Sequence, residues 1–260
     1  MSTEAAVLHQ RDDRGVVTLT MNRPASFNAL SEEMLAALQQ ALDAVAQDGG
    51  ARVVVLAAAG KAFCPGHNLK EMIATPQLAY YQALFAQCSR VMLAIQKLPV
   101  PVIARVHGIA TAAGCQLVAQ CDLAVASIEA RFAVSGVNFG LFCATPSVPL
   151  LRNMGSKQAM EMLVTGDFIS AQEAAERGLV NRAVAADQLD AEIGRLVASI
   201  LQKPRVAIAM GKELFYKQRE MGIEAAYQLA GQTMAVNMMD GCAQEGVTAF
   251  AEKRAPSWKR

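Results

Sequence analysis

The chain has 260 residues, of which 53% are hydrophobic and 18% charged, and its formal net charge is +1. This composition is typical of a globular protein, and a chain of this length can bury a large core. The near-neutral balance argues against a nucleic-acid partner or a basic membrane-binding face, and no apolar run reaches the ~18 residues of a membrane span.

The first two thirds of the chain alternate short β-rich runs with helical patterns. Ser31 is a suitable N-cap for a helix that ends at Gly49-Gly50, and a long helix over 77–96 is stopped by Pro99 and Pro101. A helical turn is predicted at 69–73 and a helix of small residues at 112–119. Strands are predicted at residues 16–20, 52–56, 102–106 and 123–126. This alternation predicts an α/β fold.

From Ser170 onward the pattern becomes helical. Helices are predicted over 171–177, 187–201, 206–219 and 223–239, with Pro204 separating two of them. No Ser/Gly-rich linker precedes this part. We therefore expect it to pack against the first part of the chain or against a neighbouring subunit.

The cysteines and the first residues of the chain indicate in which cellular compartment we expect the protein. The six cysteines include no CxxC motif, and with only three histidines their spacing fits no zinc site, so no metal is expected. Met1–Glu4 shows no basic segment leading into an apolar run, so no secretory signal is expected. The prediction is buried, reduced thiols in a cytoplasmic protein.

Two loops connect a strand to a helix and are rich in small residues. They span 63–72, FCPGHNLKEM, and 107–117, HGIATAAGCQL. The N-terminus of a helix leaves backbone N–H groups unpaired, and small residues allow a ligand to approach them. Any α/β unit needs such turns, so on these grounds alone they are connections. No phosphate-binding loop, dinucleotide fingerprint or complete serine-hydrolase motif competes with them.

The same two loops, with further motifs, resemble the crotonase family, also called the enoyl-CoA hydratase/isomerase family. Three of the other motifs are continuous: NRPASFNAL at 22–30, CDLAVA at 121–126 and FAEKR at 250–254. The fourth is spaced, with TG at 165–166, then Ala171 and Ala174, then GLV at 178–180. The resemblance covers nearly the whole chain.

The resemblance implies an α/β spiral of β-β-α units over residues 1–200 that binds acyl-CoA, and a helical oligomerisation region over 201–260. It implies a homotrimer or a dimer of trimers acting on a CoA thioester in fatty-acid or related acid metabolism, with no cofactor beyond the coenzyme A of the substrate. Its oxyanion hole falls on the N–H groups of His67 and Ala113. Family positions for substrate binding fall on Ala25, Phe27, Asn68, Leu69, Lys70, Phe250 and Lys253, the last two in a neighbouring subunit.

The chain departs from the family at the acid–base residues. Well-characterised hydratases of the family use two glutamates, and their positions fall on Gln116 and Gly136. Neither residue can take a proton from water at neutral pH. Because acid–base catalysis contributes ~10²–10⁴-fold, we expect standard hydration to be weak or absent. His67 could supply an imidazole base or only a positioning contact, and Cys143 could act as a nucleophile only with a lowered pKa.

Three functions remain open from the sequence. The first is an acyl-CoA enzyme of hydratase/isomerase type with weak standard hydration. The second is a non-catalytic acyl-CoA-binding oligomer. The third is another reaction of the family, such as isomerisation or thioester hydrolysis.

Overall fold

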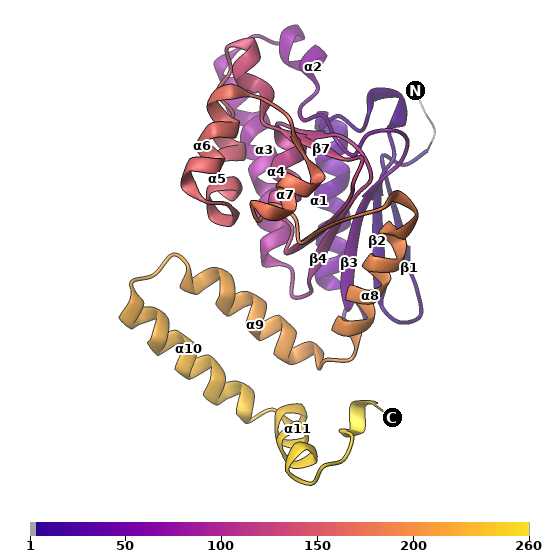
Figure 1. Cartoon of the computed structure of the whole chain (residues 1–260), viewed down its shortest axis with the longest axis vertical. Coiled ribbons are helices and arrows are strands. Elements are labelled where there is room, and N and C mark those ends of the chain that lie inside the picture. The colour runs from indigo at the N-terminus through magenta and orange to yellow at the C-terminus, as the bar shows by residue number, and fades with distance from the viewer. Residues whose placement is uncertain (1–3, 260) are drawn as a thin grey trace.

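A six-stranded sheet forms the centre of the chain in the computed structural model, which describes residues 4–259 (Figure 1). Its order is β1-β2-β3-β4-β6-β9, and only the β1–β2 pair is antiparallel. The strands are β1 (Val7–Arg11), β2 (Val16–Met21), β3 (Val53–Ala58), β4 (Val102–Val106), β6 (Leu123–Ser127) and β9 (Arg182–Val184). The four strands expected from the sequence are confirmed. Residues 1–3, part of the segment in which no secretory signal was expected, lie outside the described residues.

Helices cover both faces of this sheet, as the alternation along β3 requires. Val54 and Leu56 point into the larger core, towards α1 (Glu32–Gln47), α3 (Leu78–Lys97) and α4 (Ala113–Gln120). Val53 and Val55 point to the other face, where α8 (Leu189–Leu201) packs. Parallel strands buried on both faces read as continuous apolar runs, which is why these strands were visible in the sequence.

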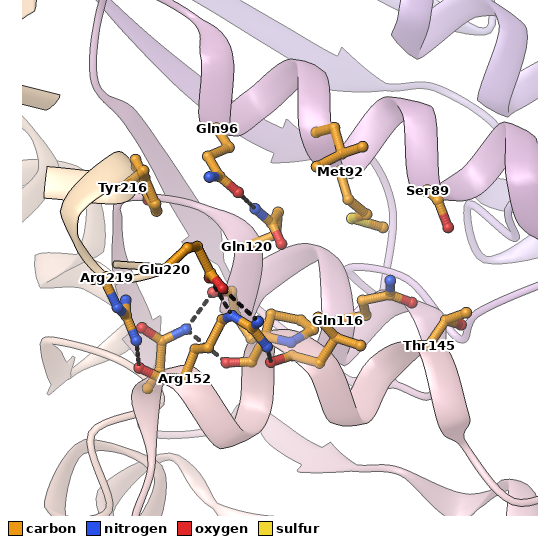
Figure 2. A pocket seen from close by; sticks show the side chains of 15 residues that line it. Ser89, Met92, Gln96, Gln116, Gln120, Thr145, Arg152, Tyr216, Arg219 and Glu220 are labelled. Atoms are coloured by element: carbon orange, nitrogen blue, oxygen red, sulfur yellow. Dashed lines mark hydrogen bonds and ion pairs between the residues drawn. The ribbon is translucent and has the colours of Figure 1, made fainter. Parts of the chain in front are cut away.

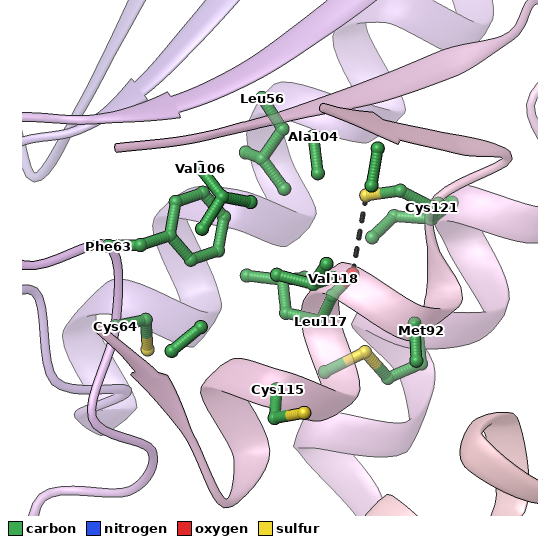
Figure 3. Packing of buried hydrophobic residues seen from close by; sticks show 14 of the residues in the cluster. Leu56, Phe63, Cys64, Met92, Ala104, Val106, Cys115, Leu117, Val118 and Cys121 are labelled. Carbon is green, nitrogen blue, oxygen red and sulfur yellow. Dashed lines mark hydrogen bonds between the residues drawn. The ribbon is translucent and has the colours of Figure 1, made fainter. Parts of the chain in front are cut away.

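The larger core brings the sheet against α4. Figure 3 shows Leu56, Ala104 and Val106 of the sheet facing Leu117 and Val118 of α4. All six cysteines are free thiols, as predicted. Five of them are also buried, as predicted, whereas Cys242 is half-buried.

Several short elements were not predicted. A second, three-stranded sheet contains β5 (Ala110–Thr111), β7 (Arg131–Ala133) and β8 (Ile169–Ser170). The unpredicted helices are α5 (Ala144–Asn153), α6 (Ser156–Thr165) and α11 (Gly241–Ala251). Strands of two or three residues are too short to show a period, and α5 carries Pro149 in its interior. The short helices α2 (Leu69–Ala74) and α7 (Ala171–Glu176) match the prediction.

The C-terminal helices α9 (Arg205–Gln218), α10 (Ile223–Met238) and α11 extend away from the sheet (Figure 1). Lys212 ties α9 to the core, because its ammonium group contacts Asp122 Oδ2 at 2.6 Å and the carbonyls of Ile95 and Val100 at 2.9 Å. Within residues 4–259, none of the helices has the length and apolarity that crossing a membrane requires.

Candidate active site

The two small-residue loops of the sequence are fastened to each other. Cys64 forms an isolated parallel bridge with Ala110, and the N–H of Thr111 donates to the Cys64 carbonyl at 3.0 Å. The Thr111 hydroxyl donates to the carbonyl of Pro65 at 2.9 Å. A Cβ on Gly114 would lie 2.0 Å from the Cys64 oxygen, so only glycine permits this approach. The start of α4 is therefore held against the loop that follows β3.

Two backbone N–H groups remain unpaired where these loops meet. The N–H of Leu30 donates to Gly66 and the N–H of Asn68 donates to Leu30, so the N–H of His67, between them, points away from Leu30. Ala113 is the first residue of α4, where an N–H has no partner within the helix. Neither of these two groups has an acceptor among residues 4–259.

Gly66 places the two groups close together. Its φ is +100°, a conformation that side chains rarely adopt, and a Cβ there would lie 3.0 Å from Ala112 Cβ and 3.1 Å from the nitrogen of Ala113. Ala112 also has a positive φ, of 47°. Such strained backbone is frequent at functional sites. The turn before His67 thus lies so close to the donor at Ala113 that a side chain at Gly66 would press on it.

A cavity of about 450 Å³, a size typical of ligand sites, lies over both groups. His67 and Ala113 line it together with Gly136, Leu69 and Phe85. The other lining residues are mostly apolar: Pro65, Met72, Thr111, Ala112, Ser135, Phe139, Leu141, Phe142, Cys143, Ala144, Thr145 and Pro146. No carboxylate lines this cavity among the residues that the structure describes.

Gln116 and Gly136, where the glutamates of the family's hydratases were expected to fall, lie in different surroundings. Gly136 lines the cavity, and a Cβ there would lie 2.4 Å from the Leu141 carbonyl oxygen and 2.8 Å from Cys143 Sγ. Gln116 lies one turn after Ala113 but lines an adjoining cleft instead. Thr145 lines both spaces. The structure therefore brings His67, Ala113 and Gly136 together and sets Gln116 beside them.

The two ionisable side chains of the cavity are both held neutral. Burial lowers the pKa of His67, an effect that the nearby Leu30 carbonyl offsets in part. Neither ring nitrogen of His67 has a hydrogen-bond partner within residues 4–259, and the ring packs edge-on against Phe85 at 5.4 Å. Burial raises the pKa of the Cys143 thiol, although the N–H of Gly136 donates to its sulfur at 3.3 Å. This shift is opposite to the one a nucleophilic cysteine needs.

The other predicted substrate residues lie around the mouth of the cavity or away from it. Asn68 caps α2, with its side chain accepting from the N–H of Lys70 at 3.1 Å, so it orients the loop. Leu69 is 54% exposed and lines the cavity. Lys70, Ala25 and Phe27 are exposed and do not line it.

Phe250 belongs to α11 and Lys253 follows this helix, which lies beyond α10 near the C-terminus (Figure 1). Neither residue lines the cavity within one chain. Phe250 is 86% exposed, and Lys253 has a φ of 54°. Their predicted contact with the site of a neighbouring subunit stays a prediction.

Two residues that hold the site were not predicted. Asn28 is fully buried and donates to the carbonyls of Ala59 and Ala62, at 2.8 and 3.1 Å, while its side-chain oxygen accepts from Arg23. It fixes the loop that leads to Gly66. Phe85 supports the His67 ring from α3. The sequence shows Asn28 only as part of a motif, since its contacts are with backbone more than thirty residues away.

Comparison with known proteins identifies the family. A family model described as enoyl-CoA hydratase/isomerase matches residues 11–260. A crystal structure of enoyl-CoA hydratase from Mycobacterium smegmatis superposes with a TM-score of 0.97 at 65% identity, covering 99% of this chain and 100% of that one. The crystal structure of human enoyl-CoA hydratase domain-containing protein 3 gives a TM-score of 0.92 at 43% identity, covering 97% and 100%. The Xenopus laevis relative of the same name is 44% identical over 256 residues, which cover 98% of this chain and 86% of the relative.

The cytoplasmic location expected from the sequence is wrong by this comparison, because the Xenopus, rat and human relatives are named as mitochondrial proteins. Free thiols bear on oxidising compartments alone. They do not distinguish the cytoplasm from the inside of an organelle. The expected fold and family are both confirmed, since the family model matches residues 11–260 and the two solved structures cover 99% and 97% of the chain. The chain belongs to the enoyl-CoA hydratase/isomerase family and has its crotonase fold.

Proposed function

We propose that this chain is an enzyme that binds CoA thioesters and holds the thioester carbonyl oxygen between the N–H groups of His67 and Ala113. The observation that carries the proposal is the pair of unpaired donors beside an apolar cavity of about 450 Å³. Preformed donors in a dry site stabilise the negative charge that develops on such an oxygen, and one donor is worth ~2.7–4 kcal/mol. Because both donors are backbone groups, they do not depend on side-chain identity.

The reaction that the site supports least is standard two-glutamate hydration. Adding water to an enoyl thioester needs one group to take a proton from water and one to give a proton to the α-carbon. No carboxylate lines the cavity within the described residues, and the backbone around Gly136 leaves no room for a side chain. We therefore propose hydratase/isomerase-like chemistry with weak or absent standard hydration.

A second candidate is a non-catalytic acyl-CoA-binding oligomer. It is favoured by the lack of a lining carboxylate among the described residues, by burial that makes the His67 imidazole a weaker base, and by the raised pKa of the Cys143 thiol. A third is isomerisation or hydrolysis with another group as the base. Product analysis separates the three.

The assembly and the remaining contacts belong to the same proposal. We propose a homotrimer or a dimer of trimers, with residues 1–200 as the acyl-CoA-binding core and 201–260 as the oligomerisation region. Exposed apolar side chains on the C-terminal helices support this division. Ala25, Phe27, Asn68 and Lys70 would contact the CoA moiety, and Phe250 and Lys253 would reach the site of a neighbouring subunit.

The test measures binding and turnover separately. Calorimetry with crotonyl-CoA is expected to show binding, whereas the hydration assay is expected to show turnover well below the ordinary range of about 1–10³ s⁻¹. A panel of enoyl, 3-hydroxyacyl and malonyl thioesters then identifies any other reaction. Turnover of crotonyl-CoA within the ordinary range would refute the claim of weak hydration, and absence of binding would refute the thioester site.

The donor pair is tested with Gly66→Ala, because a methyl group there would press on Ala112 and on the nitrogen of Ala113. A chromophoric cinnamoyl-CoA reports polarisation through the red shift of its absorption on binding. The variant is expected to lose most of this shift, while Gly49→Ala, where a Cβ meets nothing within 4 Å, keeps it. An unchanged shift in folded Gly66→Ala would argue against this geometry.

A further inference from the structure

A second cleft, of about 370 Å³, adjoins the thioester cavity. It lies between α3, α4, α5 and the end of α9, and Thr145 lines both the cleft and the cavity. Gln116 lines it from α4, three residues after Ala113 and thus on the same side of that helix. An acyl chain whose carbonyl group lies at Ala113 can therefore extend from the cavity into this cleft.

Gln116 is a buried polar group without a partner. Its side chain is only 4% exposed and makes no hydrogen bond within residues 4–259, and its Oε1 is fully buried. A buried acceptor without a partner destabilises the protein in the absence of a ligand. Its neighbour Gln120, by contrast, donates to Gln96 at 3.4 Å (Figure 2). The orphaned Oε1 is an acceptor that only a donor would satisfy, whereas Nε2, which has no partner among the described residues either, can donate to an oxygen of a ligand in the cleft.

The charges of the cleft are unbalanced. Arg152, Arg219 and Glu220 are the charged residues that line it among those described. Arg152 pairs with Glu220 at 3.2 Å, and both are drawn joined across the cleft in Figure 2. Arg219 donates to the carbonyl of Arg152 and lies 5.5 Å from the Phe215 ring centre, but has no carboxylate partner in the described chain. One positive charge is therefore in excess.

We propose that this cleft receives a carboxylate at the far end of the acyl group, so that the preferred ligands are CoA monothioesters of dicarboxylic acids. The Arg219 guanidinium would pair with the carboxylate, a charge-assisted contact of the strong kind, and the Gln116 amide would donate to it or to an oxygen nearer the thioester. A plain alkyl chain would leave both groups unpaired, which is the basis on which polar sites reject apolar analogues. This inference rests on the proposed thioester site.

The test compares the affinities of adipyl-CoA and hexanoyl-CoA, whose acyl chains have the same length, by calorimetry on the full chain in its native assembly. The wild type is expected to bind adipyl-CoA about tenfold more tightly, which corresponds to about 1.4 kcal/mol. Arg219→Gln is expected to abolish the preference while leaving hexanoyl-CoA affinity within about twofold. Lys217→Gln removes an exposed charge from the same helix outside the cleft and should keep the preference.

Gln116→Leu offers a second measurement. This variant replaces the unpaired amide with an apolar group of similar size. It should therefore bind hexanoyl-CoA more tightly relative to adipyl-CoA, so that the preference for adipyl-CoA becomes smaller. Equal affinities in the wild type, or a preference that survives in Arg219→Gln, would overturn the inference and leave the thioester site standing. Failure to bind either thioester would overturn both.

Discussion

Backbone geometry at a few residues defines the candidate site. Gly66 at a φ of +100° and Ala112 at 47° turn the two loops so that the donors of His67 and Ala113 face one cavity. Asn28, also at positive φ, holds the loop before Gly66 by its side chain. Positive φ is strained for Ala112, although Asn tolerates it better, and such strain is maintained only where the surrounding structure enforces it. The candidate donors are thus fixed before any ligand arrives.

The histidine of the site makes stability depend on pH. Burial lowers the pKa of His67 below its ordinary 6.5, so the unfolded chain takes up this proton first as pH falls. The free energy of unfolding is then unaffected by His67 above that value and decreases below it. We expect the melting temperature of His67→Phe to fall less than that of the wild type between about pH 7.5 and about pH 5.5.

His9→Phe is the matched control for this prediction, because His9 is an exposed histidine of β1 that does not line the cavity. Its melting temperature is expected to follow the wild-type pH dependence. Identical pH dependence in His67→Phe and the wild type would mean that the His67 ring is protonated as readily in the folded protein as in the unfolded chain.

At the level of elements, α9 is joined to the core by one buried ion pair. Lys212 and Asp122 are 6% and 14% exposed in their side chains, and the hydroxyl of Tyr216 donates to the same carboxylate at 2.8 Å. Burial lowers the pKa of Lys212, and Asp122 opposes this effect. Since every hydrogen of the ammonium group has a partner, the pair fixes where α9 crosses the core. Arg219 directly follows α9, so its place in the lining of the second cleft depends on the position of this helix.

Removing one partner of this pair leaves a buried charge. Lys212→Met is expected to lower the free energy of unfolding by about 3–5 kcal/mol, measured by denaturant titration at fixed protein concentration. Lys212→Met with Asp122→Asn should recover part of the loss, because no charge is then left unpaired. Lys217→Met, which removes an exposed pair with Glu213, should cost no more than about 0.5 kcal/mol. A small loss for Lys212→Met, equal to that control, would contradict the role of the pair.

Elements with a clear apolar period or cap could be predicted from the sequence, and the two- and three-residue strands of the second sheet could not. The continuous apolar run of β3 and the N-cap Ser31 of α1 are local signals, and both were found in their places. Strands β5 and β7 have two and three residues and depend on pairing with each other, which no local pattern encodes. The expected donors at His67 and Ala113 came from motif resemblance. That Gln116 faces a separate cleft, however, depends on where α5 and α9 pack, and only the structure shows this.

The whole molecule exposes an apolar surface on its C-terminal helices. Tyr227, Met234 and Met238 are 74%, 72% and 45% exposed and recur at helical spacing along one side of α10. Phe250 of α11 is 86% exposed. Contiguous apolar surface of this kind marks interfaces in soluble proteins. Its position, away from the thioester cavity, fits a role in assembly.

We therefore expect the wild type to have the mass of a trimer or hexamer in size-exclusion chromatography with light scattering. The double variant Tyr227→Glu with Met234→Glu should shift it towards the monomer, because an interface would then bury unpaired charges. Ile128→Glu alters an exposed apolar residue outside these helices, 57% exposed, and should leave the mass unchanged. A monomeric wild type would contradict the proposed assembly, and dissociation by Ile128→Glu alone would place the subunit contacts elsewhere. Loss of acyl-CoA binding together with dissociation would further indicate that Phe250 and Lys253 complete the site of a neighbouring subunit.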